Sequence, residues 1–152
     1  MLQSPFLHDW LFFHAERRPD APAVATPSAR LSYGDLATRV RSMAGHLAER
    51  GVGHGSRVLV ALPNVPATVV AGLAIHSLSG IAVEVNRAWG PELLDGLVAQ
   101  SGVRHAIVWG RDARTWSAVT GKRSLDHLWV VHPGPLPPPI SAALQATSTV
   151  PW

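Results

Sequence analysis

Three closely spaced glycines, Gly51, Gly53 and Gly55, are the first candidates for binding chemistry in this sequence. Glycine lets a phosphate approach the backbone N–H groups, which is how nucleotide-binding loops work. Such loops lead from a strand into the N-terminus of a helix, whereas this segment follows an expected helix and precedes an expected strand. A structural turn is therefore the better interpretation, with Gly51 closing the helix in a left-handed conformation.

Two other segments have the strand-to-helix polarity that an anion site requires. In the first, Asn64 lies between two prolines, which remove backbone donors that an anion would need. We expect Asn64 to cap the next helix, and ligand contact is the weaker alternative. In the second, residues 110–113 follow an apolar run, and Arg111 could supply charge to an anion. A plain loop is the better interpretation there as well.

Glu84 is a single charge inside an apolar run, and a buried carboxylate requires a partner or a raised pKa. Arg87 is the sequence-local candidate for an ion pair with it. Both residues fall near the carboxyl end of an expected parallel strand, where α/β proteins place ligands. We favour a structural pair over a substrate contact.

The spacing of the remaining reactive side chains predicts no catalytic site and no metal site. No two of the eight histidines are spaced as a metal-binding pair with a carboxylate nearby. We expect His76 to be a core residue of an apolar helix. Asp126 and His127 are adjacent and must point in different directions. Lys122, the one lysine, follows a single glycine and does not make a phosphate loop. The sequence thus predicts no catalytic residue and no metal ligand, and leaves any cofactor-binding residues unknown.

Hydrophobic periodicity predicts the elements that carry these residues. Leu36, Val40, Met43 and Leu47 form one apolar helical stripe, preceded by Ser32 as a helix cap with Asp35 as the capping-box acid. We expect this helix to pack on a sheet. The expected strands are 23–25, 30–32, 57–62, 81–85, 105–109 and 128–132, and the expected helices are 7–17, 33–50, 67–78, 91–100 and 113–119.

Strands that alternate with helices indicate βαβ units and hence an α/β fold with a mainly parallel, doubly wound sheet flanked by helices. We expect the last strand at 128–132. Residues 133–139 contain five prolines, which favours an extended connector. The domain prediction is therefore an α/β unit over residues 1–132, followed by a Pro-rich connector and C-terminal tail over residues 133–152.

Composition narrows the class of protein further. With 47% hydrophobic and 15% charged residues, the 152-residue chain is neither disordered nor a charged tail. Its net charge of +3 comes from scattered arginines, which disfavours nucleic acid binding. The absence of cysteine fits a cytoplasmic location, and prolines interrupt the longest apolar tract, so no membrane span is expected. The arginine-rich, alanine-rich composition fits a GC-rich bacterial genome.

The stretch from Leu31-Ser32-Tyr33-Gly34-Asp35-Leu36 through Leu62-Pro63-Asn64 to Asn86 resembles the N-terminal region of the adenylate-forming superfamily. This superfamily comprises acyl-CoA synthetases, peptide-synthetase adenylation domains and luciferases. The resemblance covers roughly residues 7 to 132 and consists of structural residues. It departs from the family at 83–87, where relatives commonly read Val-Pro-Leu-Asn-Pro and this chain reads Val-Glu-Val-Asn-Arg.

The resemblance implies a ligase that joins a carboxylic acid to AMP from ATP, with Mg²⁺, and then passes the acyl group to coenzyme A or a carrier-protein pantetheine. The family's Ser/Thr/Gly-rich loop with its lysine, its ribose-binding acid and its C-terminal lysine have no counterpart here. We therefore expect a chain that stops before the phosphate loop and that, alone, is inactive and binds no cofactor. Its expected partner is the remainder of the ligase or a complementary chain, and exposed apolar surface would favour self-association of the lone chain. Two alternatives stay open: a non-catalytic assembly domain, and a small flavodoxin-like binding module.

Overall fold

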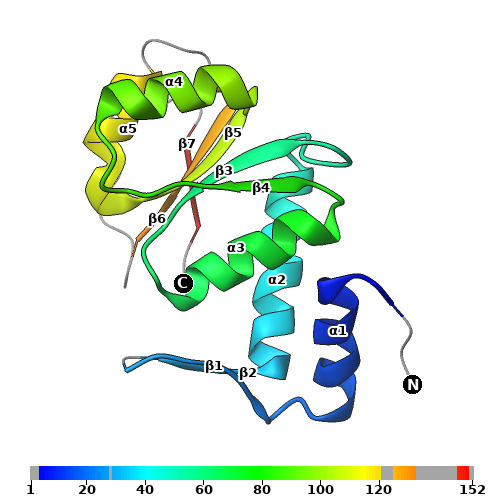
Figure 1. Cartoon of the computed structure of the whole chain (residues 1–152). Helices are drawn as coiled ribbons and strands as arrows, with labels where there is room; N and C mark the ends of the chain where they lie inside the picture. Colours follow the sequence, from blue (N-terminus) through cyan, green and yellow to red (C-terminus); the bar gives the residue numbers. More distant parts are fainter. Residues whose placement is uncertain (1–3, 28, 121–124, 133–146, 151–152) are drawn as a thin grey trace. The chain divides into compact units, whose positions relative to one another are not determined.

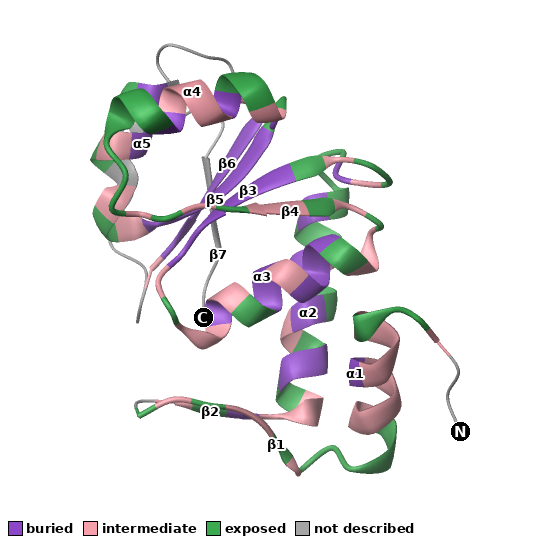
Figure 2. Cartoon of the chain, in the orientation of Figure 1, coloured by how far each residue is buried: buried purple, intermediate pink, exposed green. Residues whose placement is uncertain are grey.

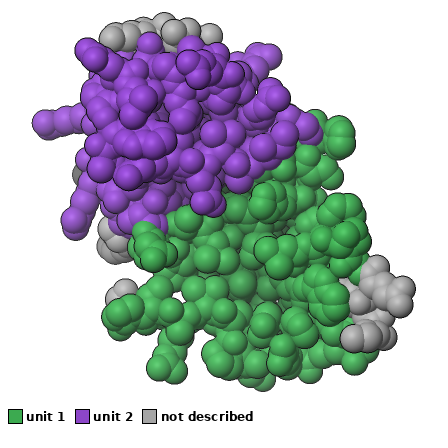
Figure 3. Space-filling model, in the orientation of Figure 1, with its two compact units in different colours: residues 1–54, 64–80 green, residues 55–63, 81–152 purple. Residues whose placement is uncertain are grey.

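A computed structural model of the chain describes residues 4–27, 29–120, 125–132 and 147–150. The chain divides into two compact units, the first made of residues 1–54 and 64–80 and the second of residues 55–63 and 81–152 (Figure 3). The first unit carries a two-stranded antiparallel sheet, and the second carries a five-stranded parallel sheet (Figure 1).

The first unit consists of three helices and a β-hairpin: α1 (Leu7–Arg17), β1 (Pro22–Ala25), β2 (Arg30–Ser32), α2 (Tyr33–Ala48) and α3 (Pro66–Ser77). Helix α2 buries the predicted stripe of Leu36, Val40, Met43 and Leu47. Within this unit it contacts α1, α3 and both strands of the hairpin. Helix α3 contacts both α1 and α2, as expected for a helix that is apolar nearly all round.

The N-terminus of α2 has the predicted capping box. The Asp35 backbone N–H donates to the Ser32 hydroxyl oxygen over 3.1 Å, and the Ser32 backbone N–H donates to a carboxylate oxygen of Asp35 over 3.1 Å. Two backbone donors at the helix start are thereby satisfied within four residues of sequence. The backbone bond from Ser32 lowers the pKa of Asp35, because it favours the charged carboxylate.

The predicted capping role of Asn64 is wrong. Helix α3 begins at Pro66, its N-cap residue is Val65 in an extended conformation, and no side chain caps it. Asn64 lies one residue too early and is exposed. Pro66 at the first helical position needs no hydrogen-bond acceptor and has its backbone angle set for a helix, so the helix starts there without a polar cap.

The second unit is built on five parallel strands, with helix α4 and helix α5 in the connections. Their order across the sheet is β4-β3-β5-β6-β7. The bounds are β3 (Arg57–Ala61), β4 (Ile81–Glu84), α4 (Pro91–Ser101), β5 (His105–Trp109), the short 3₁₀ helix η1 (Gly110–Asp112), α5 (Ala113–Thr120), β6 (His127–Val131) and β7 (Thr147–Val150). The predicted fold class, a mainly parallel doubly wound sheet, is confirmed.

Strand β7 was not predicted, since the pattern placed the last strand at 128–132. It pairs in parallel with β6, from Leu128 opposite Thr147 to Val131 opposite Val150. A short run of hydroxyl-bearing and branched residues has little hydrophobic alternation, so pairing with β6 rather than local pattern defines this strand. The rest of the predicted connector, residues 133–146 and 151–152, lies outside the described residues.

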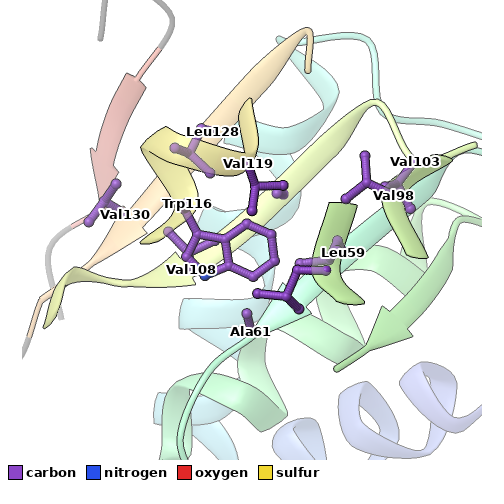
Figure 4. Close-up of a cluster of buried hydrophobic side chains, with 11 residues drawn as sticks. Leu59, Ala61, Val98, Val103, Val108, Trp116, Val119, Leu128 and Val130 are labelled. Atoms are coloured by element: carbon purple, nitrogen blue, oxygen red, sulfur yellow. The ribbon is translucent and has the colours of Figure 1, made fainter. Parts of the chain in front are cut away.

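One face of the sheet packs on α4 and α5 around the Trp116 indole, which is 1% exposed. Figure 4 shows Leu59, Val108, Val119 and Leu128 around this ring. Strands β3, β5 and β6 are buried along nearly their whole length, whereas β4 at the edge of the sheet is not (Figure 2). Nearly continuous apolar strands are typical of the centre of a parallel sheet, which is covered on both faces.

Candidate functional site

The carboxyl ends of the parallel strands gather several polar residues, among them Arg87 and Arg111 of the sequence predictions. Strand β4 runs into Asn86 and Arg87, β5 runs into the η1 turn with Arg111 and Asp112, and β6 is followed by His132. Counting β3 as the first strand, the order is 2-1-3-4-5, and the direction of winding reverses between β3 and β5. Sheets of this kind bind ligands outside the carboxyl ends at that reversal, so this edge is the candidate site.

An ion pair joins two of these segments. The Arg87 Nε donates to a carboxylate oxygen of Asp112 over 2.6 Å, and the two side chains are only 30% and 24% exposed. Strand β3 lies between β4 and β5, so the pair spans the carboxyl end of a strand to which neither residue belongs. Asp112 was not identified from the sequence as a partner, because only the strand order brings these residues together across 25 positions.

The predicted pairing of Glu84 with Arg87 is therefore wrong. Glu84 is exposed, although it lies opposite the buried Val60 in the strand register. The reason is that β4 is an edge strand in the described part of the sheet, so its carboxylate reaches solvent instead of the core. A solvated carboxylate needs no buried partner, and Arg87 is left to pair with Asp112.

The loop after β4 is held by short-range bonds. The side-chain oxygen of Asn86 accepts from the Ala88 N–H over 2.9 Å, and the Asn86 carbonyl accepts from the Trp89 N–H over 3.1 Å. Gly90 then provides the N-cap of α4 in an extended conformation. These bonds fold residues 86–90 into a compact turn, in which Trp89 is 37% exposed.

Gly110, at the end of β5, packs directly against the imidazole of His132 at the end of the neighbouring β6. A Cβ atom at position 110 would overlap this ring, so a larger residue there would force the imidazole of His132 to move. Arg111, the next residue, is exposed. The predicted loop at 110–113 is thus a 3₁₀ turn that leads into α5, and its role in anion contact stays a prediction.

In its described part, this edge offers charge and hydrogen-bond donors, and no described nucleophile there is paired with a base. Arginine donors in a fixed orientation recognise carboxylate or phosphate oxygens. Among the described residues no group of three or more histidine, aspartate or glutamate side chains could hold a metal ion. Lys122 lies outside the described residues.

The glycine segment at 51–55 is a turn between α2 and β3. Gly51 and Gly55 have φ angles of 82° and 72°, the left-handed conformation expected where a helix closes and a strand begins. His54 in this turn is exposed. These angles fit the interpretation of the three glycines as part of a structural turn.

The prediction that His76 is a core residue is wrong. His76, expected in the core, is exposed in the last turn of α3. The buried imidazoles are His105 and His127, and burial lowers the pKa of His105. Asp126 instead bonds Arg104 over 2.7 Å, and this bond lowers the pKa of the carboxyl. The structure therefore brings no histidine and carboxylate together as a triad in its described part.

The fold is an α/β domain built on a parallel sheet, with charged side chains along the carboxyl edge of that sheet. The chain belongs to the AMP-binding enzyme family, whose model matches residues 11–145, and corresponds to the N-terminal region of adenylate-forming ligases. No described helix is both long and apolar enough to cross a bilayer.

Among its relatives, malformin synthetase mlfA of Aspergillus neoniger is 33% identical over 110 residues, which are 72% of this chain and 2% of that protein. Phenyloxazoline synthase MbtB of a Mycobacterium species is 33% identical over 110 residues, 72% of this chain and 9% of the other. The fold is similar to that of the anthranilate CoA ligase AuaEII, solved with anthranoyl-AMP, with a TM-score of 0.80 and 20% identity over 90% of this chain and 26% of that one. The chain thus spans a small part of each of these relatives.

Proposed function

We propose that this chain forms the N-terminal, sheet-bearing part of an acyl-CoA synthetase-like AMP-forming ligase. In the complete enzyme a carboxylic acid would react with ATP to give an acyl adenylate and pyrophosphate, and the acyl group would then pass to a thiol. The observation that carries this proposal is the family match over residues 11–145. In this assignment residues 1–132 form the α/β part, and residues 133–152 form a connector and a tail that adds strand β7 to its sheet.

The residues of this chain do not fit the binding of ATP and Mg²⁺ by themselves. The sequence contains a single lysine and no Ser/Thr/Gly-rich loop before it, and the described residues hold no metal-binding cluster. Neutralising a departing pyrophosphate requires cations and backbone donors that converge on it. We therefore assign this chain no catalytic step, and ATP, Mg²⁺ and coenzyme A or pantetheine belong to the complete ligase.

The partner of this chain in the proposal is the remainder of the ligase, either on the same polypeptide or on a complementary one, in the cytoplasm. Large apolar side chains are exposed in both units, and such surface favours association when it gathers in patches. Among the described residues they are Phe6, Leu7, Val69, Ile81, Trp89 and Leu93. Self-association of the isolated chain is the corresponding expectation.

Acid-dependent exchange between ATP and pyrophosphate tests the proposal, with the chain alone and with the polypeptide encoded immediately downstream, over a panel of fatty and aromatic acids. We expect exchange only in the mixture, and the acids that support it identify the substrate class. Exchange by the lone chain would contradict the assignment of no catalytic step. Absence of exchange both with the chain alone and in the mixture would favour a non-catalytic assembly domain.

A further inference from the structure

The Arg87–Asp112 ion pair differs in its placement from an otherwise matched pair on the same sheet. Arg104 Nε and an Asp126 carboxylate oxygen lie 2.7 Å apart, close to the 2.6 Å of Arg87 and Asp112. Arg104 and Asp126 precede the neighbouring strands β5 and β6, so they lie at the amino edge. The Arg104 side chain is 72% exposed, against 30% for Arg87.

The carboxyl-edge pair connects segments that no strand pairing joins. Arg87 belongs to the turn at residues 86–90, and Asp112 ends the η1 turn that leads into α5. Because β3 separates β4 from β5, the ion pair reaches across the end of β3 to the place where the winding reverses. It thus ties two loops together at the edge where such sheets bind ligands.

The turn at residues 86–90 has a backbone fixed by local bonds, and it carries Trp89, a residue that is 37% exposed. The Asn86 side chain and carbonyl hold Ala88 and Trp89 through bonds of 2.9 and 3.1 Å, while the adjacent Arg87 is anchored to Asp112. The local bonds shape the turn, and the ion pair attaches it to the η1 turn that follows β5. Binding sites need such support, since small displacements of a contacting group weaken binding markedly.

We propose that Arg87 and Asp112 are positioning residues for the ligand that the complete ligase binds at the carboxyl edge, and that they act by holding the turn at residues 86–90 against the η1 turn. This inference rests on the proposed function for the existence of that ligand. In this role the two residues would act without contacting the reacting atoms. Its loss raises the KM for the carboxylic acid and leaves kcat within about twofold of the wild type.

The first experiment measures hydrogen exchange of backbone amides on this chain alone. Arg87→Gln should increase exchange at residues 86–90 by about tenfold, whereas the matched variant Arg104→Gln should leave these amides as they are. Thermal unfolding of both variants provides the control for stability. Equal protection of residues 86–90 in the wild type and in Arg87→Gln would overturn the proposal.

The second experiment measures acid-dependent ATP–pyrophosphate exchange with the downstream polypeptide present. We expect Arg87→Gln and Asp112→Asn to raise the KM for the acid about tenfold, Arg104→Gln to leave it unchanged, and the swapped variant Arg87→Asp/Asp112→Arg to recover most of the loss. An unchanged KM in an active mixture would overturn this inference alone. Absence of exchange in the wild-type mixture would overturn the proposed function and, with it, the ligand role of Arg87 and Asp112.

Discussion

His105 and His127 lie directly opposite each other on the neighbouring parallel strands β5 and β6. They are 7% and 5% exposed, and both rings pack against Trp129, with ring centroids 5.9 and 4.3 Å from its own. Within the described structure the Nδ1 atom of His105 is buried without a hydrogen-bond partner. A buried imidazole of this kind resists protonation, and burial accordingly lowers its pKa from the ordinary 6.5.

This burial predicts acid sensitivity of the fold. Because the pKa of His105 is lower in the folded state, the unfolded chain binds more protons below about pH 6.5, and the free energy of unfolding falls as the pH drops from there. One such group contributes at most about 1.4 kcal/mol per pH unit. Urea unfolding of the wild type and of His105→Leu between pH 5 and 8 measures the difference. We expect a shallower pH dependence in the variant, and the exposed His76→Leu serves as control. If the free energy of unfolding of His105→Leu has the same pH dependence as that of the wild type, His105 is not the source of the acid sensitivity.

The capping box of α2 predicts a local loss of stability. Ser32→Ala removes the acceptor for the Asp35 N–H and should lower the free energy of unfolding by about 1 kcal/mol. Ser42, exposed in the middle of the same helix, is the matched control, because Ser42→Ala should be neutral or slightly stabilising. Chemical denaturation of the two variants makes the comparison, and equal effects would show that the cap contributes nothing.

The contact of Gly110 with His132 predicts a coupled pair of substitutions. Gly110→Ala places a Cβ where the imidazole lies and should cost about 1 to 3 kcal/mol. In the background of His132→Ala the same change should cost much less, because the overlapping ring is gone. A double-mutant cycle on the free energy of unfolding measures this coupling. Additive effects would mean that the two residues are not in contact.

Gly45 and Gly51 both have free space for a Cβ atom, but they differ in backbone conformation. Gly51 has a φ of 82°, so Gly51→Ala should destabilise by about 1 kcal/mol. Gly45 lies inside α2, where alanine favours the helix, and Gly45→Ala should stabilise by about 0.5 to 1 kcal/mol. Opposite shifts in melting temperature are the expected result. A shift of the same sign in both would contradict the left-handed turn.

Features that depend on neighbours along the chain follow from the sequence. The capping box of Ser32 and Asp35 and the stripe from Leu36 to Leu47 are set by contacts within a few residues, and the structure contains both. The alternation of apolar strands with helices likewise indicates the parallel sheet, because each crossover must cover the strands that it connects. The family resemblance rests on the same kind of local structural residue.

Features that depend on strand order could only be decided in three dimensions. Glu84 is exposed because β4 lies at the edge, Arg87 meets Asp112 because both reach the end of β3, and β7 exists because β6 offers it a partner. No spacing in the sequence encodes which strand lies beside which. The sequence by itself therefore determines the elements up to β6, the fold class and the family resemblance. The tertiary structure decides the added strand β7 and which side chains meet at the carboxyl edge, since both depend on neighbours across the sheet and not along the chain.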